Sequence, residues 1–181
     1  MIDRVVTITG PPGSGKSTAG RLVATALSLE FRSAGELFRA EAARRSLDVE
    51  EFSRYAEGHP EVDRALDAEM VRLAAPGRLL DGRLTGALAR RQGVPCHTLR
   101  VTCEAEERYR RLAGRDGLSL EEATARTKAR ERSEHDRYLR YYGIDLDREV
   151  PDLSVDSTHL PAAEVAGRLL AYLRAPGPAA P

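Results

Sequence analysis

Hydrophobic positions along the chain fall into two alternating patterns. Short β-branched runs predict strands that are buried on both faces, and longer stretches with apolar residues three or four positions apart predict helices. Strands that alternate with helices form βαβ units with right-handed crossovers, and such units build a parallel sheet. The predicted strands cover residues 4–9, 29–32, 79–81, 97–102 and 153–156. We therefore expect an α/β fold built on a five-stranded parallel sheet.

Two predicted helical segments are additional to the helices that connect the strands of such a sheet. Residues 34–75 show no strand pattern and are interrupted twice, so they predict two or three short helices inserted after the second strand. Residues 119–142 form a second, highly charged segment, which ends before Gly143. At its start, Ser119 and Glu122 have the spacing with which two side chains cap each other's backbone amides. The first predicted helix covers residues 16–28, and the last one follows Pro161.

The loop after the first strand has the spacing of a Walker A motif, GxxxxGK followed by Ser, between a predicted strand and a predicted helix. Its glycines allow backbone amides to surround phosphate oxygens, and the following helix directs its positive end toward them. Lys16 would reach the β and γ phosphates, and the Ser17 hydroxyl would bind Mg²⁺. The predicted nucleotide-binding residues are Gly10, Gly13, Ser14, Gly15, Lys16, Ser17 and Thr18.

An aspartate follows the third predicted strand. Asp81 lies where a parallel sheet presents its ligands, and its carboxylate could orient Mg²⁺ through a water molecule. The alternative is a structural role in the Asp81-Gly82 turn. Arg83, two residues later, would point into the same cleft.

Arginines dominate the charged segment near residue 130. Arg130 and Arg137 lie seven residues apart on one helix face, and Glu134 between them could bind both guanidinium groups. Phosphoryl transfer develops negative charge on donor and acceptor oxygens, which arginines on a mobile element would neutralise. A solvated charged face is the alternative. Arg108, Arg111 and Arg115, just upstream, could supply further positive charge.

The order of these features resembles that of the nucleoside monophosphate kinases, and more closely the archaeal-type cytidylate kinases. The resemblance rests on the segments SAGELFR (33–39), YAEGHPEVD (55–63), DGRL (81–84) and YYGID (141–145). It implies a three-layer P-loop NTPase fold in one domain, residues 1–174, followed by a disordered tail, 175–181. Within that domain, it implies a core (1–33, 76–107 and 144–174), a helical insertion that binds the monophosphate (34–75) and a lid (108–143).

The resemblance also implies roles for individual residues. Ser33, Gly35 and Arg39 would line the monophosphate site, where Arg39 and Arg83 would hold the acceptor phosphate. Bacterial cytidylate kinases carry an aspartate where this chain has Leu84, so the base must be recognised by other residues. The resemblance further implies that Lys16, Arg130 and Arg137 act in catalysis. It places Glu134 between the two lid arginines, and it places Asp63 and Asp67 where they face the base.

The predicted function is transfer of the γ-phosphoryl group of ATP, with Mg²⁺, to CMP or dCMP. Three alternatives remain open from the sequence. The acceptor could be AMP or a small metabolite, as in shikimate-type kinases. The chain could instead be a P-loop ATPase that acts as a regulator or assembly factor, or a kinase that repairs nucleic-acid ends.

The charge balance and the composition disfavour some classes of binding partner. Twenty-eight basic residues balance 28 acidic ones, which disfavours a protein whose main role is nucleic-acid binding. The chain shows no signal peptide pattern and no long apolar run, and we expect a cytoplasmic monomer with small-molecule substrates, without nucleic-acid or membrane partners. Cys96 and Cys103 lack a metal-binding pattern and are predicted to be buried thiols. The four histidines receive no metal or base role.

Overall fold

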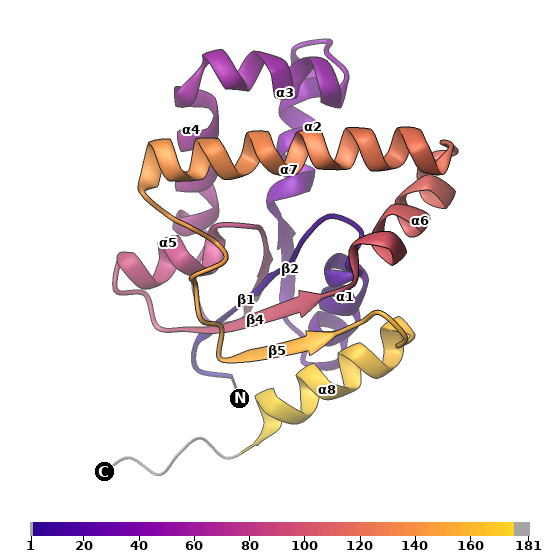
Figure 1. Cartoon of the computed structure of the whole chain (residues 1–181). Helices are drawn as coiled ribbons and strands as arrows, with labels where there is room; N and C mark the ends of the chain where they lie inside the picture. Colours follow the sequence, from indigo (N-terminus) through magenta and orange to yellow (C-terminus); the bar gives the residue numbers. More distant parts are fainter. Residues whose placement is uncertain (1, 176–181) are drawn as a thin grey trace.

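The computed structural model describes residues 2–175, and the predicted disordered tail beyond Ala175 lies outside the described residues. Its centre is a sheet of five strands in the order β2-β3-β1-β4-β5, in which every neighbouring pair is parallel (Figure 1). The predicted five-stranded parallel sheet is therefore confirmed. The strands are β1 (Val5–Thr9), β2 (Glu30–Ser33), β3 (Arg78–Asp81), β4 (Cys96–Thr102) and β5 (Leu153–Asp156).

Helices cover both faces of this sheet. Val5 and Val6 are both fully buried, but successive strand residues point to opposite faces, so they belong to different cores. On the Val6 side, α1 (Lys16–Ala26) packs beside α8 (Ala162–Arg174). On the Val5 side lie α4 (Pro60–Arg72) and α5 (Thr85–Arg91). The arrangement confirms the predicted three layers.

The segment after β2 was predicted to form two or three helices, and it forms three: α2 (Ala34–Arg44), α3 (Val49–Gly58) and α4. They share a small core of their own around the fully buried Phe52 ring. A capping box formed by Asp48 and Glu51 starts α3, in addition to the one that the sequence analysis identified.

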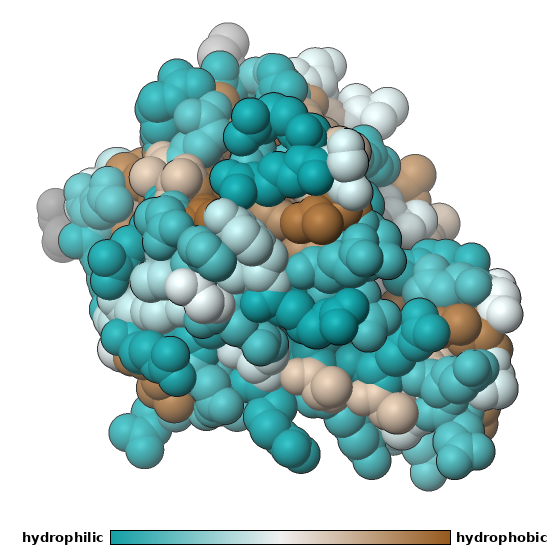
Figure 2. All heavy atoms as spheres, turned by 90° about the horizontal axis from the view of Figure 1, so that it is seen from above, coloured by the Kyte–Doolittle hydropathy of each residue, from teal (hydrophilic) through white to brown (hydrophobic). Residues whose placement is uncertain are grey.

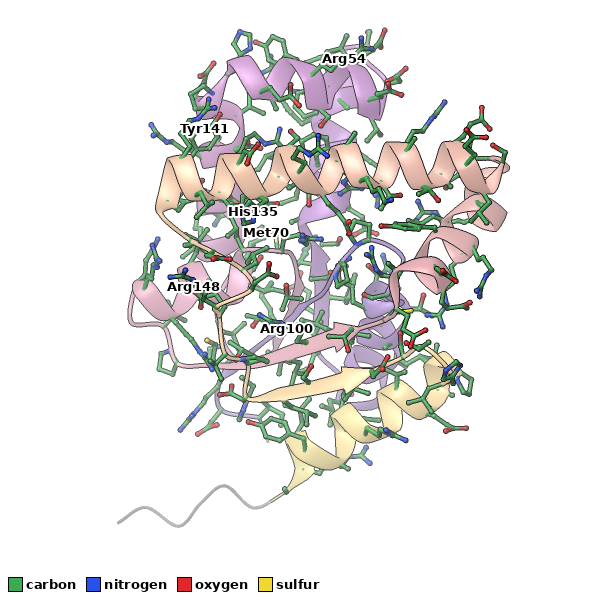
Figure 3. The ribbon with its side chains drawn as sticks, in the orientation of Figure 1. Arg54, Met70, Arg100, His135, Tyr141 and Arg148 are labelled. Carbon is green, nitrogen blue, oxygen red and sulfur yellow. The ribbon has the colours of Figure 1, made fainter. Side chains whose placement is uncertain are left out.

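Two more helices cross above the sheet, α6 (Ala105–Asp116) and the long α7 (Leu120–Tyr142) (Figure 1). The predicted capping box of Ser119 and Glu122 is present at the start of α7, and Gly143 ends the helix with a φ of 61°. The loop beyond is held by β4: Arg100, labelled in Figure 3, donates to the carbonyls of Leu146 and Glu149.

Several local predictions were inaccurate. The first helix ends at Ala26 instead of residue 28, where Ser28 has a φ of 52°, and β2 begins one residue later than expected. The helices α5 and α6 were not predicted, and α6 spans the boundary proposed at residue 108. Cys96 and Cys103 are free but only partly buried, which corrects the expectation of buried thiols.

Within residues 2–175, no helix combines the length and the apolar composition that crossing a membrane requires. The surface seen from above in Figure 2 is mostly hydrophilic, with small and separate hydrophobic areas.

Candidate active site

The loop between β1 and α1 lies so close to β4 and α6 that two of its positions have no room for a side chain. A Cβ added at Gly10 would lie 2.2 Å from the Val101 carbonyl oxygen of β4. At Gly13, where φ is +81°, it would lie 2.7 Å from the Arg108 carbonyl oxygen of α6. These glycines let the loop turn tightly and leave its amides available, as a phosphate site requires.

Lys16 begins α1, directly after Gly15 at its N-cap, so the side chain starts where the helix presents its positive end. Burial lowers the pKa of Lys16, and the nearby Asp81 carboxylate opposes this effect. The guanidinium groups of Arg83 and Arg130 lower it further. Three positively charged side chains therefore lie close together: Lys16 of α1, Arg83 in the turn after β3 and Arg130 of α7.

Asp81 ends β3 and is only 3% exposed. Its Oδ2 accepts hydrogen bonds from the Ser17 hydroxyl at 2.5 Å and from the Ser33 hydroxyl at 3.3 Å. Its Oδ1 is buried without any hydrogen-bond partner. A carboxylate oxygen left unpartnered beside a serine hydroxyl fits the oxygen ligands that Mg²⁺ prefers.

The register of the sheet explains why these groups meet. Ile8 pairs with Asp81 across β1 and β3, so the glycine loop and Asp81 leave the sheet at the same edge. The Thr9 hydroxyl donates to the Arg83 carbonyl at 3.1 Å, which fixes the turn that carries the Arg83 side chain.

Glu134 of α7 is the carboxylate on which two of these arginines converge. Its side chain is 7% exposed; Oε1 accepts from Arg130 Nε at 2.7 Å, and Oε2 lies 3.6 Å from Arg83 Nε. Burial opposes ionisation of Glu134, but Arg130 and Arg83 outweigh it, so the pKa of this carboxyl lies below its usual value. Glu134 stays ionised and holds both guanidinium groups near Lys16.

Arg137 has a different partner from the one that the sequence predicted. We expected Glu134 to bind both Arg130 and Arg137, but Arg137 Nε lies 3.3 Å from Asp63 Oδ2 on α4, and its Nη1 donates to the Ser53 carbonyl at 3.5 Å. The helical insertion approaches α7 closely enough to supply these oxygens, which the spacing within α7 cannot reveal. Arg137 therefore joins α7 to the insertion and is not paired with Glu134.

The residues predicted for a monophosphate site lie together at the start of α2. A Cβ added at Gly35 would be 3.5 Å from Arg39 Nη1 and 3.6 Å from Ser33 Oγ. Ser33 is buried and also bonds to Asp81, whereas Arg39 is exposed. This cluster therefore adjoins the edge where the glycine loop lies.

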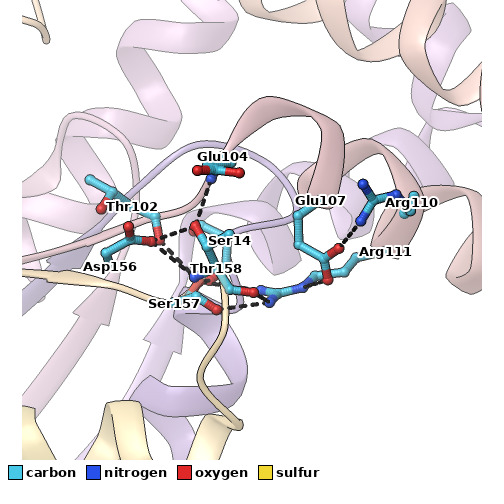
Figure 4. Close-up of polar contacts among 9 residues, drawn as sticks. All are labelled: Ser14, Thr102, Glu104, Glu107, Arg110, Arg111, Asp156, Ser157 and Thr158. Atoms are coloured by element: carbon cyan, nitrogen blue, oxygen red, sulfur yellow. Dashed lines mark hydrogen bonds and ion pairs between the residues drawn. The ribbon is translucent and has the colours of Figure 1, made fainter.

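A cavity of about 320 Å³ adjoins the glycine loop at Ser14, Gly15 and Thr18. Arg111 of α6 donates to the Ser157 carbonyl at 2.8 Å and to the Thr158 carbonyl at 3.1 Å (Figure 4). The Ser157 hydroxyl donates to the Ser14 carbonyl of the glycine loop at 2.8 Å. The cavity is lined by Ser14, Gly15, Thr18, Arg111, Ser157, Leu160, Pro161, Ala162 and Val165.

The loop after β5 was not among the residues predicted for the site, although its position is a signal for such a role. A polar Ser157-Thr158 pair directly follows the last parallel strand, at the edge where ligands of such sheets bind. Arg108 was expected only as a possible source of further positive charge. Arg108 is 7% exposed, and its Nη1 donates both to the Pro12 carbonyl at 3.0 Å and to Glu131 of α7 at 2.6 Å. This side chain connects α7 directly to the loop.

Known sequences resemble this chain over most of its length. The AAA domain family matches residues 9–137. The cytidylate kinase of Archaeoglobus fulgidus is 38% identical over 155 residues, which cover 84% of each chain. The cytidylate kinase of Pyrobaculum arsenaticum is 42% identical over 158 residues, which cover 86% of this chain and 85% of the relative. The chain belongs to the cytidylate kinase family.

Solved structures of kinases share the fold at much lower identity. Shikimate kinase from Bacteroides thetaiotaomicron has a TM-score of 0.60 at 16% identity, covering 94% of this chain and 98% of that one. A gluconokinase from Sinorhizobium meliloti has a TM-score of 0.61 at 15% identity, covering 95% and 92%. These likenesses show the fold alone, and they confirm the predicted P-loop architecture.

We predict that the glycine loop binds nucleotide, and Gly10→Ala tests this prediction. The added methyl group would overlap the Val101 carbonyl oxygen, so the loop must shift. We expect nucleotide affinity, measured by calorimetric titration, to fall about tenfold or more. Gly114→Ala in α6 is the control, because nothing lies within 4 Å of the added atom. Wild-type affinity in Gly10→Ala would contradict this reading of the loop.

Proposed function

We propose that the protein transfers the γ-phosphoryl group of ATP to CMP or dCMP. The observation that carries this proposal is the convergence of Lys16, Arg83 and Arg130 beside the glycine loop. Three cations at a phosphate-binding loop match the charge that develops during phosphoryl transfer. The names of the relatives at 38% and 42% identity support cytidylate as the acceptor.

The donor nucleotide would lie along the loop. The backbone amides from Gly10 to Thr18 would hold the phosphates, with Lys16 on the β and γ phosphates. The cavity between Arg111 and the loop after β5 would take the adenosine, since it continues directly from Gly15 and Thr18. Within it, the guanidinium plane of Arg111 would offer a surface on which a base can stack.

Mg²⁺ would be held by the Ser17 hydroxyl and, through water, by Asp81, whose Oδ1 is buried without a partner. When bound, the ion neutralises phosphate charge and orients the transferring group.

The acceptor phosphate would lie between Arg39 and Arg83. Ser33 and Gly35 would line this site, and the contact between Ser33 and Asp81 places it next to the donor. Arg83 has a buried Nη1 with no hydrogen-bond partner, which is available for a phosphate oxygen. Because that oxygen is already ionised near neutral pH, the reaction requires no general base and no covalent intermediate.

Catalysis would then consist of alignment and charge neutralisation. Arg130 and Arg83, held by Glu134, would neutralise oxygens of both nucleotides, and Arg137 would keep α7 against the insertion. Closure of α7 over the two phosphates would exclude the water that otherwise hydrolyses ATP.

The location, the oligomeric state and the partners of the protein belong to the same proposal. We infer a cytoplasmic monomer that acts on free nucleotides and has no nucleic-acid partner. The zero net charge and the two free cysteines support this inference.

An ADP-release assay with ATP and Mg²⁺ tests the function. It compares CMP, dCMP, UMP, AMP and GMP with a control that lacks an acceptor. We expect strong stimulation by CMP or dCMP. Stimulation by AMP alone would overturn the acceptor assignment, and equal slow hydrolysis with and without acceptors would favour a regulatory ATPase.

Arg130→Ala tests the role of α7. Removing this guanidinium should lower kcat about 10³-fold, because it would neutralise charge mainly in the transition state, while ATP affinity persists. Arg132→Ala is the matched control, since Arg132 is an exposed arginine two residues away on the same helix. Steady-state kinetics check both variants, and a near wild-type kcat in Arg130→Ala would refute the assignment.

A further inference from the structure

Arg108 of α6 is a buried arginine that holds a peptide group of the glycine loop. Its Nη1 donates to the Pro12 carbonyl at 3.0 Å and to Glu131 Oε1 of α7 at 2.6 Å. Because Nη1 carries two hydrogens, both bonds can form at the same time. Glu131 already compensates the buried charge, so the bond to Pro12 is an additional interaction whose effect falls on the loop.

The bond to Pro12 determines where the next amide of the loop points. No cis peptide bond occurs within residues 2–175, so the unit that joins Pro12 to Gly13 is trans and planar, and its C=O and N–H point in opposite directions. Since the carbonyl points toward α6, the Gly13 N–H points away from α6. Among the described residues, this N–H donates to no backbone carbonyl.

The same arrangement recurs two residues further along the loop. The Ser14 carbonyl accepts a hydrogen bond from the Ser157 hydroxyl at 2.8 Å (Figure 4), which turns the Gly15 N–H in the opposite direction. Within residues 2–175, the Gly15 N–H also has no backbone partner. Pro12 and Ser14 are buried, whereas Gly13 and Gly15 are partly exposed. Two amides therefore face the open side of the loop.

The loop by itself would not keep its amides in this orientation. Glycine has the widest choice of backbone conformations, and both Gly13 and Gly15 have a φ near +80°, at 81° and 80°. The Ser14 N–H between them is used inside the loop, where it donates to the Pro11 carbonyl at 3.2 Å. Amides that converge on one side of a turn bind anions. Holding the carbonyls from outside fixes this arrangement in advance and reduces the ordering cost of binding.

We propose that Arg108 is a positioning residue of the glycine loop, which holds the Pro12 carbonyl and thereby keeps the Gly13 amide turned toward the phosphates of the donor nucleotide. This inference rests on the proposed function, in which the loop binds ATP, and adds a residue that acts through the loop. Glu131 fixes the guanidinium from the other side. Because Glu131 is the neighbour of Arg130 in α7, the same contact links the loop amide to the helix that carries Arg130.

Calorimetric titration of Arg108→Met tests the proposal, because methionine keeps an apolar stem but cannot donate to Pro12. We expect the affinities for ADP and for inorganic tripolyphosphate, a probe without base or ribose, to fall about tenfold or more, the effect of losing one hydrogen bond to a charged ligand. CMP affinity should not change, because its proposed site lies at Arg39 and Arg83. Arg110→Met, at an exposed arginine two residues away on α6, is the matched control.

A role limited to joining α6 to α7 gives a different result. Arg108→Met would then lower the unfolding temperature and leave ADP affinity at the wild-type value, which would overturn the proposal. Glu131→Gln provides a variant that keeps the arginine and changes a partly exposed side chain. We expect it to weaken ADP binding in the same selective way but to a smaller extent, whereas Asp136→Asn, at an exposed position of α7, should have no effect.

Nuclear magnetic resonance of protein labelled with ¹⁵N-glycine observes the amide itself. When ADP binds to the wild-type protein, we expect the Gly13 resonance to move downfield, because its N–H donates to a phosphate oxygen. In Arg108→Met this shift should be lost, whereas Gly15, whose peptide unit is held by Ser157, should keep its own shift. An undiminished Gly13 shift in Arg108→Met would overturn the proposal. Failure of the proposed function is a separate result, in which no monophosphate stimulates ADP release from the wild-type protein.

Discussion

The arrangement of the site depends on one buried carboxylate, that of Glu134. Taking a charge out of water costs several kcal/mol, and here the cost is offset by Arg130 on the same helix and Arg83 on the core. The interaction thereby does two things at once. It fixes two guanidinium groups beside Lys16, and it holds the long helix α7 over the edge of the sheet where the glycine loop emerges. The bonds from Arg108 to the loop and to Glu131 strengthen the same connection.

The remaining contacts of α7 follow from its position. Along its length it meets the inserted helices through Arg137 and Asp63, Tyr142 and Asp67, and a hydrogen bond from Ser133 to Glu57. Each of these joins a polar group on α7 to a polar group on the insertion, so the interface is held by pairs that a ligand or water can replace. Such an interface is compatible with the closure of α7 that we propose for the reaction.

Much of the fold and part of the site could be predicted from the sequence, because their signals are local. The central strand β1 is a short β-branched run, the glycine loop directly follows it, and Asp81 ends β3, where a parallel sheet places its ligands. The helix α5 has only seven residues, too few to show a helical period. The partner of Arg137 could not be predicted, since Asp63 is 74 residues away in sequence and is brought near by the packing of α4 on α7. The position of Ser157 directly after β5 is a local signal, but its contact with Arg111 depends on long-range packing in the same way.

The most direct test of this account is a rapid-quench measurement of a single turnover with ATP and CMP. It compares the wild-type protein with Glu134→Gln, a variant that keeps the shape of the side chain and removes its charge. We expect the rate of phosphoryl transfer to fall on the order of a hundredfold at saturating substrates, because Arg130 and Arg83 lose the charge that positions them. ATP affinity, which we propose is set by the glycine loop, should stay near the wild-type value. A wild-type transfer rate in Glu134→Gln would contradict the central role of this carboxylate.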